Sequence, residues 1–143
     1  MFKHPLHPAL VHFPIATWTL ATAADFAALR YGQAAWSWSA GLLTVGCLMT
    51  LPAMLAGMIE LMKVPEGGAP SRDAHLHMGL MLGAFSFYLC SLVFRLQGSH
   101  ALPPDSTSLI LDALGFACLA LGGWLGARLV YQHGIGGSRT QQD

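Results

Sequence analysis

The segment AGLLTVGCLMTLPAMLAGMIELM, residues 40–62, decides the class of fold to which this chain belongs. It runs for 23 residues with one charged side chain, Glu60, close to its end. An α-helix needs about 20 apolar residues to cross the hydrocarbon core of a bilayer. The segment therefore predicts a transmembrane helix.

Three further apolar stretches flank this segment, over residues 9–29, 74–96 and 109–131. Each is long enough to cross a bilayer, and the links between them are rich in Gly, Pro, Ser and charge. The sequence thus predicts an all-α, up-down-up-down four-helix transmembrane bundle that forms one integral membrane domain over residues 1–143. Helix-capping side chains are expected at Ser71 or Asp73 for the third helix and at Asp105 or Ser106 for the fourth.

The composition agrees with a membrane protein and excludes one class of partner. Hydrophobic residues make up 54% of the 143 residues and charged residues only 10%, whereas soluble domains carry roughly 25% charged residues. Seven Lys and Arg balance seven Asp and Glu, so no basic field is present to attract nucleic acid. Membrane lipid is the expected surrounding, and nucleic acid is not an expected partner.

The first apolar stretch has an alternative interpretation as a signal peptide, because Ala21-Thr22-Ala23 resembles a cleavage site. His12 and Pro14 interrupt its apolar run and favour a permanent helix instead.

The distribution of basic residues predicts the orientation. With four crossings, both termini and the second loop share one side of the membrane. That side carries five basic residues against two opposite: Lys3, Lys63, Arg72, Arg128 and Arg139 against Arg30 and Arg95. Because basic residues accumulate on the cytoplasmic side, both termini are expected there.

Small residues spaced four apart indicate close helix packing inside the membrane. They form three pairs: Ala53 with Gly57, Gly79 with Gly83, and Gly122 with Gly126. The same pattern allows a homodimer.

The histidines gather at one membrane face when the four helices are laid out. His100 lies opposite, and the others fall at helix ends on the side of the termini, together with two acids: His4, His7, His12, His75, His77, His133, Glu60 and Asp73. Ionisable groups near the hydrocarbon layer are costly and usually line a site. Neutral imidazole is a ligand for haem iron and for zinc, copper and non-haem iron.

Haem b fits this pattern best, which gives the bundle a cytochrome b-like character. The first and third helices supply His12 and His77 at similar depth, and we expect these as the axial pair. His75 is the substitute for His77. Gly79 and Gly83 follow closely and would let a flat porphyrin lie near the backbone.

A second haem has candidate ligands in His7 and His133, with Arg72 or Arg128 available for propionates. One or two haems are therefore expected. The alternative is a zinc, copper or iron ion held by the same histidines with His4, His75 and Glu60. A further alternative is a non-redox scaffold subunit whose histidines only cap helix ends.

Other ionisable and reactive side chains receive plainer interpretations. Asp25 and Asp112 lie toward the opposite face, where Arg30 and Arg95 are expected to form interfacial ion pairs with them; one end of a proton path is the alternative. Three single cysteines lie in three apolar stretches and are expected to act as small hydrophobes: Cys47, Cys90 and Cys118. No C-x-x-C-H motif for covalent haem is present.

An enzyme is harder to support than an electron-transfer protein, because no nucleophile with its base and no phosphate loop is evident.

The two ends of the chain carry specific motifs, HPALVHFPI at residues 7–15 and LVYQHGIG at residues 129–136. With the acid near the end of the second helix and Arg95 closing the third, the chain resembles the bacterial inner-membrane family called domain of unknown function 2231. The resemblance covers nearly the whole chain. This chain has Gly126, Ala127 and Arg128 where family members often have two Gly and a Glu.

The resemblance implies a four-helix membrane unit in a bacterial inner membrane. Relatives joined to Rieske-type or cytochrome c domains imply electron transfer, with a quinone or a redox protein as partner. On the matching motifs, the resemblance points to His7, His12 and His133 as site residues.

Overall fold

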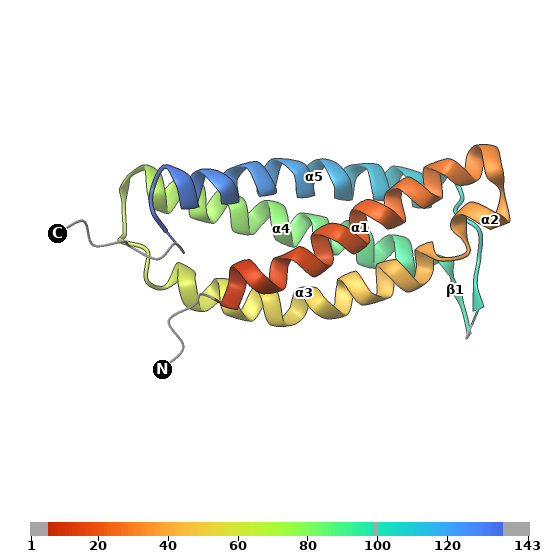
Figure 1. The fold of residues 1–143 in the computed structure, drawn as a ribbon, viewed down its shortest axis with the longest axis horizontal. Coiled ribbons are helices and arrows are strands. Elements are labelled where there is room, and N and C mark those ends of the chain that lie inside the picture. The colour runs from red at the N-terminus through yellow and green to blue at the C-terminus, as the bar shows by residue number, and fades with distance from the viewer. Residues whose placement is uncertain (1–5, 99, 136–143) are drawn as a thin grey trace.

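The computed structural model describes residues 6–98 and 100–135 and consists of a four-helix, up-down-up-down bundle, as the sequence predicted (Figure 1). Both described ends lie at one end of the bundle, and a short helix with a two-stranded hairpin lies at the other. The elements are α1 (Leu6–Tyr31), α2 (Gln33–Trp36), α3 (Ser39–Leu61), α4 (Gly68–Arg95), β1 (Leu96–Gln97), β2 (His100–Ala101) and α5 (Ser106–Tyr131).

The third long helix begins earlier than the sequence predicted. Gly67, the residue before α4, and Gly68, its first residue, have φ angles of 82° and 80°, a region that suits glycine, and they reverse the chain at the start of α4. Pro70 is tolerated in the first turn because no helical hydrogen bond needs its N–H there. Ser71 and Asp73 therefore lie inside α4 and do not cap it, which corrects the expected start near residue 74.

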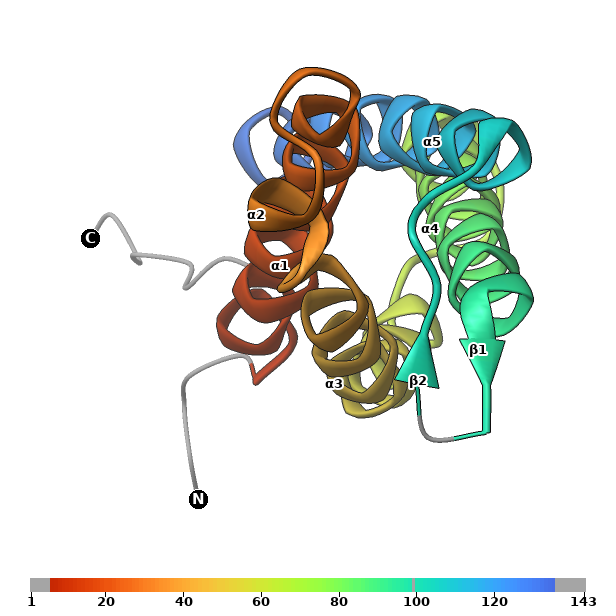
Figure 2. The same ribbon diagram turned by 90° about the vertical axis from the view of Figure 1, so that its right-hand side faces the viewer.

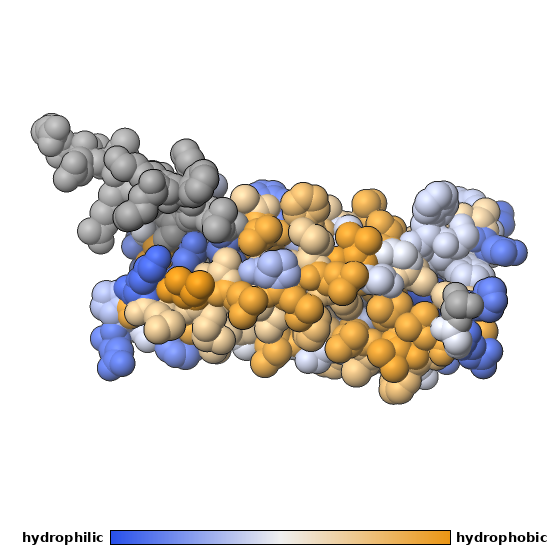
Figure 3. Space-filling model, turned by 90° about the horizontal axis from the view of Figure 1, so that it is seen from below, coloured by the Kyte–Doolittle hydropathy of each residue, from blue (hydrophilic) through white to orange (hydrophobic). Residues whose placement is uncertain are grey.

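The face of the bundle seen in Figure 3 is mostly apolar along its middle and more hydrophilic toward its ends. Within the described residues, three helical segments are long and apolar enough to cross a membrane: Gln33–Leu61, Gly68–Arg95 and Ser106–Tyr131. Helix α1 matches α5 in length, at 26 residues, but is not among the three.

The four long helices form two closely packed pairs. Helix α1 packs along α3, and α4 packs along α5. The contacts of α1 with α5 and of α3 with α4 are much smaller. Viewed down the bundle, α1 and α4 lie diagonally opposite each other, as do α3 and α5 (Figure 2).

The two pairs bury equivalent positions. Each buried residue of α1 has a buried counterpart 70 positions later in α4. The counterparts are Pro14 and Ala84, Trp18 and Tyr88, Ala21 and Ser91, Thr22 and Leu92, and Asp25 and Arg95. Five buried positions of α3 have counterparts 69 positions later in α5, namely Ser39 and Ser108, Leu43 and Asp112, Gly46 and Gly115, Thr50 and Leu119, and Ala53 and Gly122. The bundle thus approximates two copies of one helical hairpin.

An aromatic pair occupies the middle of the core. The rings of Trp18 and Tyr88 stack with centroids 4.8 Å apart and planes 20° from parallel. Each ring lies on a glycine of its partner helix: a Cβ added at Gly46 would overlap the Trp18 indole, and one at Gly115 would lie 3.0 Å from Tyr88 Cε2. The glycines therefore allow the aromatic side chains to reach the centre.

Gly46→Ala should lower the free energy of unfolding by about 1–3 kcal/mol, because the added methyl overpacks a filled core. The loss is measured by detergent-induced unfolding followed by circular dichroism. Gly41→Ala on the same helix is the matched control, since a Cβ there meets nothing within 4 Å and alanine favours the helix. Equal stability of the two variants would contradict this packing.

Helix α5 begins with the capping residue that the sequence predicted. Asp105 Oδ1 accepts hydrogen bonds from the backbone N–H and the hydroxyl of Ser108, both at 2.8 Å. These bonds favour the ionised carboxylate and hold the pKa of Asp105 below its ordinary value. Because the folded-state pKa is the lower one, the stabilisation is complete above the ordinary pKa and is lost as the pH falls through the folded value.

Asp105→Asn should make the melting temperature less sensitive to acid, because asparagine retains the cap but does not titrate. The measurement is the melting temperature as a function of pH for both proteins, with Glu66→Gln as the control for loss of an exposed acid. If the melting temperature of the variant falls on acidification as steeply as that of the parent, ionisation of Asp105 does not contribute to the pH dependence of stability.

Candidate functional site

Two histidines from diagonally opposite helices meet inside the bundle, at the end that holds the described termini. His7 of α1 donates from Nδ1 to the carbonyl oxygen of Ala53 on α3 at 2.8 Å. His77 of α4 donates from Nδ1 to the carbonyl oxygen of Gly122 on α5 at 2.7 Å. Because a carbonyl only accepts, Nδ1 carries the proton and Nε2 of each neutral ring keeps its lone pair. We call these residues the histidine pair.

The separation of the two rings suits a shared metal. Their centroids are 6.4 Å apart and their planes are 87° from parallel. An imidazole that binds a metal ion through one nitrogen has its ring centre roughly 3 Å from the ion, so two such rings can lie up to roughly 6 Å apart. Metal-bound histidines usually donate their other ring N–H to a carbonyl or carboxylate, as both members of the histidine pair do.

Glycines beside the histidine pair make room for the imidazoles. A Cβ added at Gly57 of α3 would lie 2.9 Å from His7 Cε1, and one at Gly126 of α5 would lie 3.1 Å from His77 Cε1. Each glycine comes four residues after the residue whose carbonyl accepts the hydrogen bond. The small-residue pairs on α3 and α5 therefore fix where the rings sit.

His12 and His75 lie away from the histidine pair. His12 is exposed, because it lies five residues after His7 and so points about 140° around the helix. His75 is also exposed, and its Nδ1 donates to the carbonyl oxygen of Ser71 at 2.7 Å. The structure thus brings His7 to His77, where the sequence pointed to His12.

His133 has a different partner from the one expected. Its Nε2 lies 3.0 Å from Asp73 Oδ2, and Arg128 Nε lies 3.1 Å from the same oxygen. Asp73 is buried, and its contacts with Arg128 and His133 link the start of α4 to the end of α5. His7 and His133, the expected second pair, thus contact different residues, His77 and Asp73.

The remaining residues of the expected sites are dispersed. Gly79 faces open space, and a Cβ at Gly83 would lie 3.5 Å from Cys118 Sγ. Glu60 is half-buried near the end of α3, and His4 lies outside the described residues. Across residues 6–98 and 100–135, no three His, Cys, Asp or Glu side chains gather as a group that could hold a metal ion.

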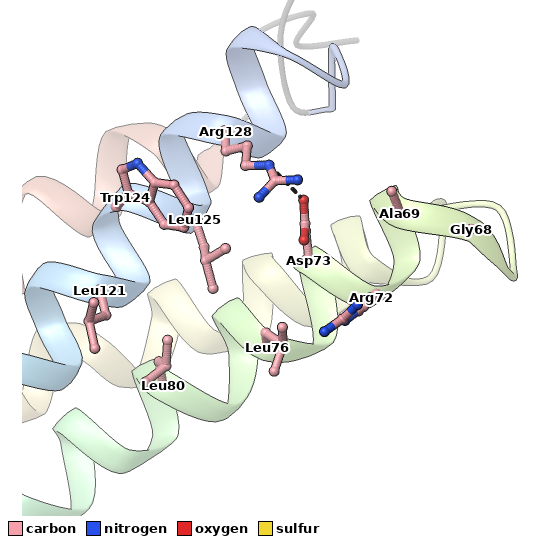
Figure 4. Close-up of a pocket in the computed structure, with 10 residues that line it drawn as sticks. All are labelled: Gly68, Ala69, Arg72, Asp73, Leu76, Leu80, Leu121, Trp124, Leu125 and Arg128. Carbon is pink, nitrogen blue, oxygen red and sulfur yellow. Dashed lines mark ion pairs between the residues drawn. The ribbon is translucent and has the colours of Figure 1, made fainter.

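A cavity of about 590 Å³ lies at the same end of the bundle, between α4 and α5 (Figure 4). Leucines and Trp124 form much of its wall, and Arg72, Asp73 and Arg128 contribute charge. The side chains of Asp73 and Arg128 point toward each other from the two helices. The lining therefore combines an apolar wall with charged groups.

A buried ion pair lies at the other end of the bundle. Arg95 donates from Nη1 to Asp25 Oδ2 at 2.6 Å, from Nη2 to Ser39 Oγ at 2.9 Å and from Nε to the carbonyl of Leu102 at 3.1 Å. The side chains of Arg95 and Asp25 are only 2% and 0% exposed. The expected interfacial ion pair is thus corrected to one inside the protein, because α1 and α4 both turn these positions toward the centre.

The other arginine and acid expected near this end take different places. Arg30 is exposed and lies over the Tyr31 ring, 5.9 Å from its centroid. Asp112 is fully buried. Arg30 therefore neutralises neither Asp25 nor Asp112.

One spacing in the sequence is shared by α1 and α4 and could have identified the histidine pair. His7 and Trp18 are 11 residues apart, as are His77 and Tyr88. When α1 and α4 are aligned so that Trp18 matches Tyr88, His7 matches His77. The small-residue spacing alone did not identify Gly57 and Gly126 as the residues that accommodate the imidazoles.

Arg95→Gln should lower the free energy of unfolding by about 3–5 kcal/mol, because it leaves the buried Asp25 carboxylate without a cation. Arg30→Gln is the matched control and should cost less than about 1 kcal/mol, since its side chain is exposed. Detergent-induced unfolding of both variants measures the difference. Equal losses of unfolding free energy in the two variants would show that the buried ion pair does not stabilise the fold.

Comparison of the chain with known proteins gives a match to one protein family. No curated protein and no solved structure matched the chain. A family model described as "Predicted membrane protein (DUF2231)" matches residues 3–139, almost the full length. The histidine pair and the buried ion pair both lie within the matched residues. The chain belongs to the DUF2231 family of membrane proteins.

Proposed function

We propose that this protein is a membrane-embedded b-type cytochrome in which His7 and His77 would hold one haem b. The observation that carries the proposal is the histidine pair itself, two imidazoles with Nδ1 held by carbonyls and ring centres 6.4 Å apart. Bound haem supplies one-electron redox chemistry at its iron. Electron transfer to or from a quinol or a partner redox protein is the corresponding activity.

The residues around the histidine pair favour haem over a single metal ion. The ligands come from α1 and α4, and the other two helices present small residues beside them: Ala53, Gly57, Gly122 and Gly126. Gly57 and Gly126 leave space for the two imidazoles themselves, and two histidines are enough to hold a haem iron. A closed site for a zinc ion instead requires about four protein ligands, and no group of three is present in the described part of the chain.

The protein's own contribution is orientation and exclusion of water. The hydrogen bonds to Ala53 and Gly122 fix the tautomer and the direction of each ring and raise the basicity of Nε2. Beyond the histidine pair, the stacked Trp18 and Tyr88 fill the core. An apolar surrounding of this kind favours whichever oxidation state leaves the site with less net charge.

One haem is proposed because the candidate ligands of a second are engaged elsewhere. His133 contacts Asp73 and His7 lies against His77. The cavity between α4 and α5 is a candidate place for a quinol, since it joins an apolar wall to polar groups at the same end of the bundle.

In this proposal α1 also crosses the membrane, because it runs the length of the bundle beside α3. The protein would reside in a bacterial inner membrane. Lys63, Arg72 and Arg128 lie at the end of the described termini, and this favours a cytoplasmic location for that end.

His7→Ala and His77→Ala should each remove most of the bound haem while the protein remains in the membrane. His12→Ala and His75→Ala are matched controls, because these exposed histidines lie on the same two helices and should retain the haem of the parent. The measurements are dithionite-reduced minus oxidised spectra and pyridine haemochrome content of detergent-purified protein.

Several outcomes would overturn the assignment. A parent protein without haem after haem reconstitution excludes the cytochrome. Zinc, copper or iron bound in its place, and lost in His7→Ala and His77→Ala, would identify a metal-ion site. Binding of neither would identify a structural role for the histidine pair. Haem lost only in His12→Ala would move the ligand to that residue.

A further inference from the structure

A second acid lies beside the buried ion pair at the end of the bundle opposite the histidine pair. Asp112 of α5 is fully buried. Asp25 of α1 and Ser91 and Arg95 of α4 face it. Together Asp25, Arg95 and Asp112 form what we call the charge cluster. Its members come from three helices, so it exists only when the two hairpins pack together.

The charges of this cluster do not balance. Two carboxylates face one guanidinium, and the hydrogen bonds of that guanidinium go to Asp25, Ser39 and Leu102. Among the residues that the structure describes, neither oxygen of Asp112 has a hydrogen-bond partner, and the same holds for Asp25 Oδ1 and the Ser91 hydroxyl, all of them buried. An ionised Asp112 would therefore be a buried charge without compensation, which is costly inside a membrane bundle.

The other groups near Asp112 do not supply the missing charge. Tyr88 of α4 is its remaining titratable neighbour, and the Tyr88 hydroxyl is 2.8 Å from Thr22 Oγ1. Helix α3 contributes the Ser39 hydroxyl, which accepts from Arg95 and does not titrate. Over residues 6–98 and 100–135, the charged groups that face Asp112 are thus Asp25 and Arg95.

We propose that Asp112 is a proton-binding site, occupied at neutral pH, inside the end of the bundle opposite the histidine pair. One added proton makes the cluster electrically neutral, with Asp25 as the counter-ion of Arg95. The new O–H also provides a donor for the unpartnered Asp25 Oδ1. Release of the proton leaves the Asp112 carboxylate, so each cycle of the site binds and releases one proton. This proposal does not depend on haem.

Infrared spectroscopy tests the proposal directly. The purified protein at neutral pH should show the carbonyl stretching band of a protonated carboxylic acid, and labelling aspartate with ¹³C at its carboxyl carbon should shift that band. Asp112→Asn should abolish the band. Glu66→Gln, which removes an exposed carboxyl on the α3–α4 turn, should leave it unchanged.

The labelled parent protein keeps the test decisive even when Asp112→Asn does not fold. Absence of an aspartic-acid band from the parent at neutral pH overturns the proposal. A band that persists in folded Asp112→Asn assigns the proton to another residue and overturns it as well. Loss of haem in His7→Ala with the band retained would show that the two sites are independent.

Discussion

The close approach of the two helices within each hairpin is the constraint on which the interior depends. Gly46 and Gly57 on α3 leave space for Trp18 and His7 of α1. The equivalent glycines on α5, Gly115 and Gly126, leave space for Tyr88 and His77 of α4. Without side chains at these positions, large polar and aromatic groups reach the centre while the backbones stay in contact. Hydrophobicity cannot provide this arrangement, because lipid is as apolar as the protein core.

Depth along the bundle separates three kinds of interior chemistry. The histidine pair lies at the end of the described termini, the stacked aromatic rings lie in the middle, and the charge cluster lies at the far end. The histidine pair, the stacked rings and the ion pair of Asp25 with Arg95 each join α1 to α4, which lie diagonally opposite each other and make few contacts. Polar contacts across the centre therefore connect hairpins whose remaining contacts are small, and this favours a fixed rotation of one hairpin against the other.

The sequence predicted the helices and the bundle because apolar length is a strong signal, and it placed the histidines at the correct end. It did not predict which face of each helix turns inward. His12 is deeper than His7 in the sequence and lies about 140° away around α1, so depth alone favoured the exposed residue. A helix that contacts lipid outside and protein inside has apolar residues on both faces, which leaves no amphipathic pattern to fix its rotation. Predicting that the ion pair of Asp25 with Arg95 is buried would likewise require knowing which faces of α1 and α4 turn inward.

The 70-residue correspondence between α1 and α4 has a consequence for charge. Three corresponding pairs meet at the centre of the bundle, namely His7 with His77, Trp18 with Tyr88 and Asp25 with Arg95. Two identical hairpins would place identical side chains at these points. Two aspartates or two arginines would then repel each other in a medium of low dielectric constant. Joining two unlike hairpins in one polypeptide allows Asp25 to face Arg95. The single chain thereby permits a complementary pair at a position where a symmetric assembly permits only like with like.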